Sequence, residues 1–178
     1  AAEAYTLAAL RALPIGTGDE FDSYLAAVSS AGFARAWGID GLPAVRKMIE
    51  HPSYDQFWQE QAVDKILAKR KLTVPTLVML GQWDQEDSYG GPAVFKAIKA
   101  AQPDAPITLG IGPWRHSGAN YEGYNLGPIR FEGDTALQFR TGWIKPFLDC
   151  RLKSAAPPCK PMPAAVTYAT GTNRWESD

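Results

Sequence analysis

An excess of charge of one sign is missing from this sequence, which holds 18 Lys and Arg residues against 19 Asp and Glu residues among 178. A formal net charge of −1 gives no overall field that would attract nucleic acid or an anionic membrane. The longest basic run is the triplet 69–71, and apolar stretches such as 77–80 are far shorter than the roughly 20 residues of a membrane-spanning helix. Nucleic-acid and membrane partners are therefore not expected.

Cysteine is also scarce, since only Cys150 and Cys159 occur, on either side of a Pro-rich loop. Their spacing fits no zinc-binding motif but is compatible with a small disulfide. A disulfide would indicate an oxidising compartment such as the periplasm. The sequence leaves two readings open, because a pair of reduced thiols fits the same spacing and sequence alone does not supply the geometry of a bridge.

An initiator Met is absent, and residues 1–13 predict an Ala-rich helix without the basic and apolar regions of a signal peptide. At the other end, residues 167–178 predict a strand followed by a turn, so a new element opens where the sequence stops. We therefore expect this sequence to be a fragment of a longer protein.

Apolar residues are abundant, at 46% against 21% charged residues, which is typical of a folded protein with one sizeable core. The region 1–70 predicts several short helices and no sheet. Apolar residues recur there at three- and four-residue steps, as in Phe21, Tyr24, Leu25 and Val28, and glycines and Pro52 interrupt the pattern.

The region 71–156 predicts alternating strands and helices. The expected elements are a strand at 73–81, a helix at about 92–101, a strand at 107–111 and a helix at about 134–153. The first strand is a nearly continuous apolar run, typical of burial on both faces of a parallel sheet. Asp134 or Thr135 can cap the last helix, and Pro146 should kink it. This order predicts the α/β class and one flank of a doubly wound sheet.

Two polar residues lie where such sheets carry reactive groups, outside the carboxyl ends of the strands. Asp84 follows the first predicted strand and His116 follows the second. In α/β-hydrolases the triad acid and base occupy two such loops, and the carboxylate holds the histidine tautomer and stabilises the imidazolium. On spacing alone a turn aspartate and a surface histidine fit as well. His51, followed by Pro52, predicts an ordinary turn between helices.

Longer motifs surround both residues. They include Trp-Asp-Gln-Glu-Asp at 83–87 and Gly-Pro-Trp-Arg-His-Ser-Gly at 112–118, with further matching stretches at 37–48, 51–58 and 73–75. Over residues 36–134 the sequence resembles the α-amino acid ester hydrolases, relatives of the cocaine esterases and X-Pro dipeptidyl peptidases. The resemblance implies that Asp84 is the triad acid and His116 the base. It also implies a partial α/β-hydrolase fold, the C-terminal part of the catalytic domain.

The same resemblance implies that the chain is divided into three parts. Residues 1–70 correspond to a helical cap segment, and residues 71–156 to the C-terminal part of the hydrolase core. Residues 157–178 correspond to the start of a C-terminal β jelly-roll domain, in which Trp175 follows the first strand and turn. From its residues alone, 164–169 also predicts the first strand of a separate β domain.

Two further carboxylates follow the predicted triad acid. In the resembling family, neighbouring carboxylates bind the α-ammonium group of the substrate, and Glu86 and Asp87 match those positions. A cluster of acids favours a cationic amine beside the scissile carbonyl. A solvated acidic turn is the alternative. A calcium loop is excluded because the sixth position from Asp84 is Tyr89 and the twelfth is Phe95. No metal and no cofactor is expected.

A nucleophile motif is absent, since no Gly-x-Ser-x-Gly elbow occurs and Ser117 directly follows the predicted base. The resemblance therefore implies a serine hydrolase whose nucleophile lies upstream, so that this chain alone is inactive. The complete enzyme would cleave esters and amides of α-amino acids through an acyl-enzyme, with possible acyl transfer to β-lactam amines.

Two alternatives remain at this point: a related esterase or X-Pro dipeptidyl peptidase without α-amino selectivity, and a noncatalytic remnant of the fold. The expected partner is a small-molecule substrate with an α-amino group. The family resemblance further implies a homo-oligomer and a periplasmic or secreted location.

Overall fold

The computed structural model describes residues 20–153 and 158–178, and the chain divides into two compact units, Ala1–Gln59 and Glu60–Asp178. The Ala-rich helix predicted for residues 1–13 lies outside the described residues. None of the helices described is long and apolar enough to cross a membrane.

The described part of the first unit is helical, as the apolar periodicity predicts. It contains α2 (Glu20–Ala27), α3 (Ser30–Ala36), α4 (Pro43–Glu50) and the start of α5 (Gln56–Gln61). Ser29 caps α3 by accepting a hydrogen bond from the Gly32 amide at 3.0 Å, and the aromatic rings of Tyr24, Phe33 and Trp37 stack in sequence. Ala34 is the buried apolar residue of this stretch.

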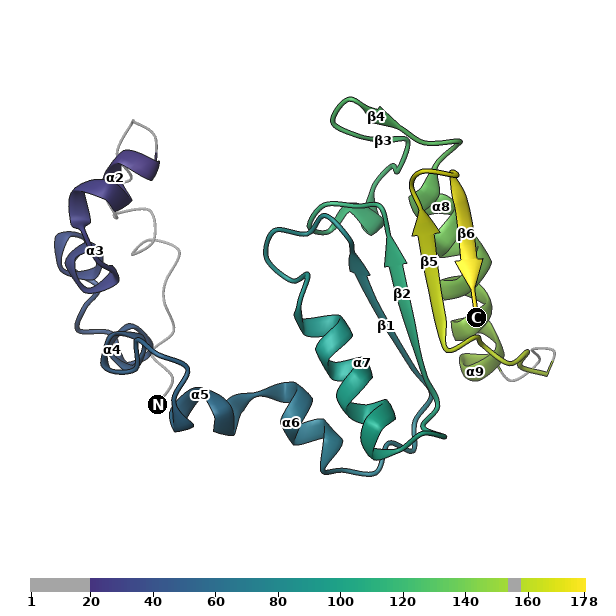
Figure 1. The fold of residues 1–178 in the computed structure, drawn as a ribbon, viewed down its shortest axis with the longest axis horizontal. Helices are drawn as coiled ribbons and strands as arrows, with labels where there is room; N and C mark the ends of the chain where they lie inside the picture. Colours follow the sequence, from purple (N-terminus) through teal and green to yellow (C-terminus); the bar gives the residue numbers. More distant parts are fainter. Residues whose placement is uncertain (1–19, 154–157) are drawn as a thin grey trace. The chain divides into compact units, whose positions relative to one another are not determined.

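The second unit is built on a four-stranded mixed sheet with the order β1-β2-β5-β6. Its strands are β1 (Thr76–Gly81), β2 (Ile107–Gly112), β5 (Ala165–Ala169) and β6 (Arg174–Ser177). The first three are parallel, with β6 antiparallel to β5. The arrows of β1 and β2 end at the same edge of the sheet (Figure 1), because Thr76 pairs with Ile107 and Gly81 with Gly112.

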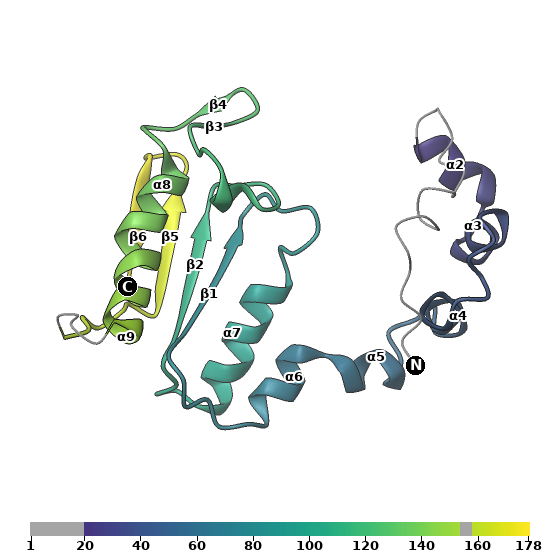
Figure 2. The same ribbon diagram turned by 180° about the vertical axis from the view of Figure 1, so that it is seen from behind.

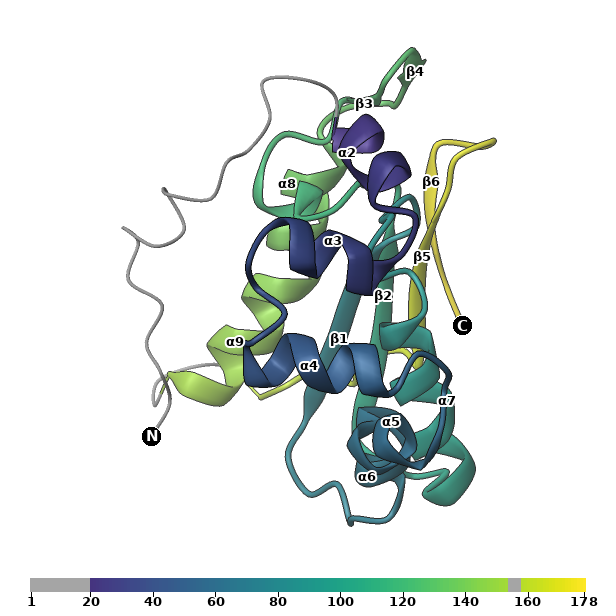
Figure 3. The same cartoon turned by 90° about the vertical axis from the view of Figure 1, so that its left-hand side faces the viewer.

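Helices cover the two faces of this sheet. On one face α7 (Gly90–Ala101) packs through Ile98 against Ile107 and Val78, with α6 (Val63–Ala68) beside it. On the other face lie α8 (Thr135–Phe139), the π-helix η2 (Arg140–Ile144) and α9 (Lys145–Leu152). Figure 2 shows α7 running along β1 and β2, and Figure 3 shows α7 and α9 on opposite sides of these strands.

Burial on both faces holds for β2 but not for β1. The residues of β2 are buried except for the partly buried Ile111, and Gly110 leaves room for the ring of Phe139. In β1, Met79 keeps 37% of its surface exposed, because β1 is an edge strand of the described sheet and this side of it lies beyond the cover of α8. The prediction of a doubly buried strand at 73–81 is therefore wrong for the described residues.

The long helix predicted for 134–153 continues past Pro146 without a break. Asp134 is its cap, accepting hydrogen bonds at Oδ1 from the amides of Leu137 at 3.0 Å and Gly123 at 2.7 Å. Pro146 lies in the first turn of α9, directly after the π-helix turn η2. The wider turn relieves the clash between the proline ring and the preceding turn, so the expected kink takes the form of a π-bulge.

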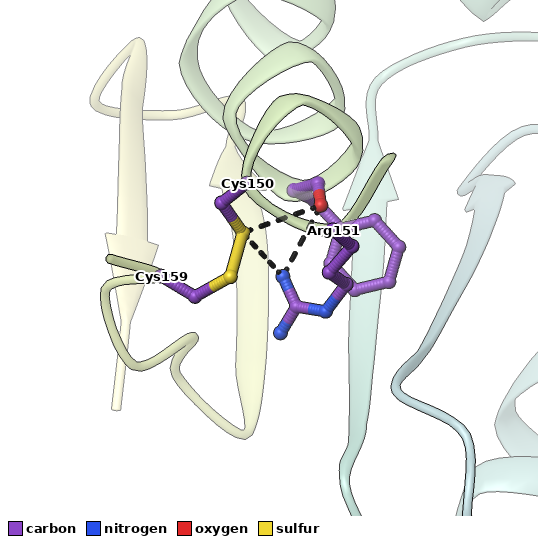
Figure 4. Close-up of a disulfide and its surroundings, with 4 residues drawn as sticks. Cys150, Arg151 and Cys159 are labelled. Atoms are coloured by element: carbon purple, nitrogen blue, oxygen red, sulfur yellow. Dashed lines mark hydrogen bonds between the residues drawn. A yellow bond between two sulfur atoms is a disulfide. The ribbon is translucent and has the colours of Figure 1, made fainter. Parts of the chain in front are cut away.

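A disulfide joins Cys150 and Cys159, with the Cα atoms 5.1 Å apart (Figure 4). It ties α9 to the segment that leads into β5. Arg151 packs its guanidinium 4.3 Å over the Phe147 ring and donates from Nη1 to the Phe147 carbonyl and to the Cys150 sulfur. The structure thus settles the question that the spacing of the two cysteines left open.

The strand expected in a separate β domain is part of the central sheet. Val166 of β5 pairs with Gly110 of β2, and Trp175 of β6 packs against Phe139, Trp143 and Tyr168. The strands β5 and β6 thus belong to the same sheet as β2 and to the same aromatic core. The jelly-roll assignment of 157–178 and the boundaries at residues 70 and 156 stay predictions.

Candidate active site

The loops after β1 and β2 are joined by backbone hydrogen bonds. The Gln82 amide donates to the Gly112 carbonyl at 2.8 Å, and the Trp83 amide donates to the Trp114 carbonyl at 3.0 Å. The two loops therefore leave the sheet side by side and hold a fixed register, which brings together residues that lie 32 positions apart in the sequence.

Glycines make this close approach possible. A Cβ on Gly81 would lie 2.3 Å from the Trp114 carbonyl oxygen, and a Cβ on Gly112 would lie 2.3 Å from the Trp114 ring. Both distances are far below van der Waals contact. A side chain at Gly81 would push the first loop away from the backbone of the second, and a side chain at Gly112 would displace the Trp114 ring of its own loop.

Trp114 anchors the loop after β2 to the core. Its side chain is buried, its Nε1 donates to Thr135 Oγ1 at 2.9 Å, and Thr135 in turn donates to the Gly123 carbonyl at 2.8 Å. The Trp114 ring also meets Phe139 edge to face, with centroids 5.3 Å apart. The loop that carries His116 is thus fastened to α8 and to the aromatic core.

The two predicted triad residues form a pair. Asp84 Oδ2 lies 3.0 Å from His116 Nδ1, and Asp84 Oδ1 lies 3.2 Å from the same nitrogen. Because an ionised carboxylate only accepts, Nδ1 carries the proton in the neutral imidazole, and Nε2 is then the acceptor. The Asp84 side chain is 6% exposed and the His116 side chain 40%, so the carboxylate is enclosed while the imidazole reaches solvent.

Each member of the pair titrates away from its ordinary range. Burial disfavours the Asp84 carboxylate, but the backbone amides of Asp87 and Glu86 and the His116 ring outweigh it and lower the pKa of Asp84. The hydrogen bond to Asp84 raises the pKa of His116 against the effect of burial, and the charges of Glu86, Asp84 and Asp87 raise it further. The carboxylate therefore stays ionised and the imidazole becomes more basic.

The remaining two predicted site residues lie on the same loop and close to the imidazole. Glu86 Oε2 is 3.9 Å from His116 Nε2, and Asp87 Oδ2 is 3.7 Å from His116 Nδ1. Their amides donate to Asp84 Oδ1 at 2.8 and 3.0 Å, which folds the loop around the acid. Both side chains are largely exposed, so two negative charges face solvent at the edge of the pair.

A small cation is the other group that such residues can hold. Asp84, Asp87 and His116 each offer one ligand atom, and these atoms lie within 4.8 Å of one another. However, Asp84 already accepts hydrogen bonds from two backbone amides and from the imidazole. The arrangement is accounted for as a hydrogen-bonded acid and base, and we assign no metal to it.

A second histidine–carboxylate pair was not foreseen in the sequence. His51 Nδ1 lies 2.6 Å from Asp55 Oδ2, and Asp55 Oδ1 accepts from the Phe57 amide. The hydrogen bond from His51 is the largest influence that lowers the pKa of Asp55. The signal in the sequence was the four-residue spacing after a helix end, which the reading of His51 as an ordinary turn residue overlooked.

No nucleophile completes the site within residues 20–153 and 158–178, where the structure shows no serine hydroxyl hydrogen-bonded to His116. Ser117 directly follows His116 and has left-handed backbone angles, φ 57° and ψ 4°. An aspartate–histidine pair at adjacent parallel strand ends, on a sheet covered by helices on both faces, is typical of an α/β-hydrolase-type fold.

Comparisons with known proteins agree with this class. The chain belongs to the X-Pro dipeptidyl-peptidase family, S15, whose model matches residues 9–118. Among solved structures, it is similar to an aminopeptidase from a marine sediment archaeon, Thaumarchaeota archaeon, at 40% identity and a TM-score of 0.84. It is also similar to an α-amino acid ester hydrolase labelled with selenomethionine, at 43% identity and a TM-score of 0.82.

The alignments with these two structures cover 91% and 90% of the chain. The chain spans 26% of the length of each. A comparison with curated protein sequences gave no match.

Proposed function

We propose that the complete protein is a serine-type hydrolase that cleaves esters and amides of α-amino acids through an acyl-enzyme. The observation that carries this proposal is the Asp84–His116 pair with Glu86 and Asp87 beside it. Membership of the X-Pro dipeptidyl-peptidase family and the likeness to an α-amino acid ester hydrolase support it.

Acylation would proceed in two proton transfers through His116. Nε2 accepts the proton of an upstream serine hydroxyl as its oxygen attacks the scissile carbonyl, while Asp84 holds Nδ1–H and stabilises the imidazolium. The imidazolium then gives the proton to the leaving alcohol or amine, and the acyl group stays on the serine. Water, or the amine of a β-lactam nucleus, attacks the acyl-enzyme by the same route in reverse.

The carboxylates of Glu86 and Asp87 would select the substrate. A free α-ammonium group is adjacent to the scissile carbonyl, so it reaches the carboxylates when the carbonyl lies near His116 Nε2. Both side chains are exposed in this structure, which screens their charge until a substrate displaces water from them.

The test compares a phenylglycine ester with its desamino analogue, the phenylacetate ester, on the complete protein. We expect kcat/KM to favour the amino ester by roughly tenfold or more, and Glu86→Gln or Asp87→Asn to reduce that preference. Asp104→Asn is the matched control, since Asp104 is exposed and lies before β2, at the opposite end of the strand from His116. Equal rates for the two esters would remove the role of Glu86 and Asp87.

A second candidate activity is removal of an N-terminal residue from peptides. The archaeal neighbour at 40% identity is an aminopeptidase, and the α-amine of an N-terminal residue stands in the same relation to the scissile carbonyl as that of an amino ester. Aminoacyl and X-Pro p-nitroanilides distinguish an aminopeptidase from a dipeptidyl peptidase. Hydrolysis of the aminoacyl anilide alone favours an aminopeptidase, and hydrolysis of the X-Pro anilide favours a dipeptidyl peptidase. If neither anilide nor any ester turns over, the noncatalytic alternative is correct.

We further propose that the protein works in the periplasm or outside the cell and forms a homo-oligomer. The Cys150–Cys159 disulfide supports the oxidising location. Cell fractionation, with thiol titration of each fraction, tests it. The oligomer follows from the family resemblance, and light scattering of the complete protein would measure it.

A further inference from the structure

The imidazole of His116 has carboxylates at both of its nitrogen edges. At Nδ1 it meets Asp84 at 3.0 Å and Asp87 at 3.7 Å, and at Nε2 it meets Glu86 at 3.9 Å. All three acids come from the loop between β1 and α7. Nε2 is the atom that exchanges protons with a nucleophile and a leaving group, so Glu86 lies at the reactive edge of the base.

This arrangement favours the wrong protonation state for a base. Three negative charges within 4 Å stabilise the imidazolium, whereas a general base must start neutral. The nearest cation in sequence, Arg115, is exposed, and among the described residues the charged groups that act on the imidazole are these three acids. An empty site therefore holds its base protonated to a higher pH than an ordinary histidine would be.

We propose that the positive charge of the substrate switches His116 into its active form: a cationic α-amine bound by Glu86 and Asp87 cancels their field and releases the proton from His116. The inference rests on the proposed function, because it uses the same amine site. It adds that the amine is an activator of the base as well as a recognition element.

The coupling is reciprocal, as linkage requires. If binding the amine expels a proton from His116, protonation of His116 must weaken binding of the amine by the same factor. Glu86 should carry the larger share at the reactive edge, since its carboxylate faces Nε2 directly. Because Glu86 and Asp87 are exposed, added salt should reduce the effect.

Kinetics provide the first test, on the complete protein. For the phenylglycine ester, the acid limb of kcat, which reports the enzyme–substrate complex, should lie at lower pH than the acid limb of kcat/KM, which reports the free enzyme. For the phenylacetate ester, which has no amine, the two limbs should coincide. Glu86→Gln should shift the kcat/KM limb to lower pH, and Asp104→Asn should leave both limbs in place.

Calorimetry provides a second test that needs no turnover. Phenylglycinol carries the α-amine without a scissile bond, and its binding can be measured in two buffers of different ionisation enthalpy. We expect proton release on binding near the midpoint of the His116 titration, and a Kd that rises by up to about tenfold per pH unit below it. Release should vanish in His116→Asn and shrink in Glu86→Gln.

The outcomes separate this inference from the proposed function. If the enzyme prefers the amino ester but the acid limbs of kcat and kcat/KM coincide and phenylglycinol releases no proton, amine recognition holds and the switch is wrong. If no preference for the amino ester is found, the proposed function itself fails. A preference together with shifted limbs and proton release supports both.

Discussion

Two histidine–aspartate pairs in one chain have nearly the same contact and different surroundings. His51 lies 2.6 Å from Asp55, and His116 lies 3.0 Å from Asp84, in both cases from Nδ1 to a carboxylate oxygen. Each histidine is partly exposed, at 28% and 40% of its side chain. By contact distance alone the first pair would be the stronger candidate for catalysis.

The difference lies in how each pair is assembled. His51 and Asp55 are four residues apart, the His51 ring stacks on Phe57 at 4.4 Å, and the His51 carbonyl accepts from Trp58 Nε1. That pair fastens the end of α4 to the start of α5. His116 and Asp84 come from two strand ends, with further carboxylates beside the imidazole. A histidine–aspartate contact indicates a catalytic role only together with its position and its other neighbours.

Removing each histidine in turn should give the largest difference between the two pairs. In the complete protein, His116→Ala should lower kcat for the phenylglycine ester by about 10⁴-fold or more, because the proton transfers of acylation lose their base. His51→Ala should leave kcat within about twofold of the parent, since a helix connection lies outside the proton-transfer path. Burst kinetics of acylation measure both. Comparable losses in the two variants would show that the pairs share a function.

Removing only the charge of each carboxylate gives the next largest effect. Asp84→Asn keeps the shape but favours the wrong tautomer at Nδ1, so kcat should fall by about 10³-fold to 10⁴-fold. Asp55→Asn should lower the melting temperature slightly and leave kcat unchanged, because it weakens the connection between α4 and α5. Steady-state rates and thermal melts measure the two effects. An unaffected rate in Asp84→Asn would remove it from the triad.

The sequence predicted one of these two histidine–aspartate pairs and missed the other. The apolar run at 73–81 and the order of strands and helices were enough to place Asp84 and His116 at neighbouring strand ends, and the structure brings the two together. The His51–Asp55 contact was missed because its four-residue spacing is a weak signal, and the contact also depends on the geometry of one helix end. Local side-chain contacts at helix ends leave little trace in apolar periodicity.

Other features depend on contacts that no single segment encodes. The segment 164–169 indicated the first strand of a separate β domain, whereas β5 pairs with β2, which lies far from it in the sequence, so the segment by itself does not encode this partner. The π-helix turn before Pro146 was also not predicted, because the proline indicated a kink and not the wider turn that accommodates it. The role of Trp114 as an anchor required the positions of Gly112 and Thr135 in space.

Packing around the second pair can be probed without touching its chemistry. Gly112→Ala places a Cβ 2.3 Å from the buried Trp114 ring, so we expect a loss of about 1–3 kcal/mol in unfolding free energy and a partial loss of activity as the His116 loop moves. Gly41→Ala, in the first unit, meets nothing within 4 Å and should change stability by no more than about 0.5 kcal/mol. Denaturant titration measures the unfolding free energy of both variants. Equal losses in the two variants would contradict the role of Trp114 as the anchor of the His116 loop.

The smallest expected effects are on the pH dependence of folding stability, which should differ between the two histidine–aspartate pairs. The pKa values of Asp55 and Asp84 are lowered, so each carboxylate stabilises the fold above its unfolded pKa near 3.8 and loses that contribution as pH falls through the folded value. The pKa of His116 is raised, so its contribution is complete below the unfolded value of 6.5 and disappears as pH rises through the folded value. Asp55→Asn should therefore flatten only the acid side of the stability curve.

His116→Asn should in addition flatten the neutral side, because the variant loses the imidazole whose proton is bound more tightly in the folded state. Melting temperatures of both variants and the parent, taken from pH 3 to pH 8, provide the measurement. The shifts should be small and should shrink with added salt, since Glu86, Asp87 and the imidazole reach solvent. A parent curve with no decline above pH 6.5 would mean that the acids around His116 do not hold its proton, and it would undercut the substrate-driven switch as well.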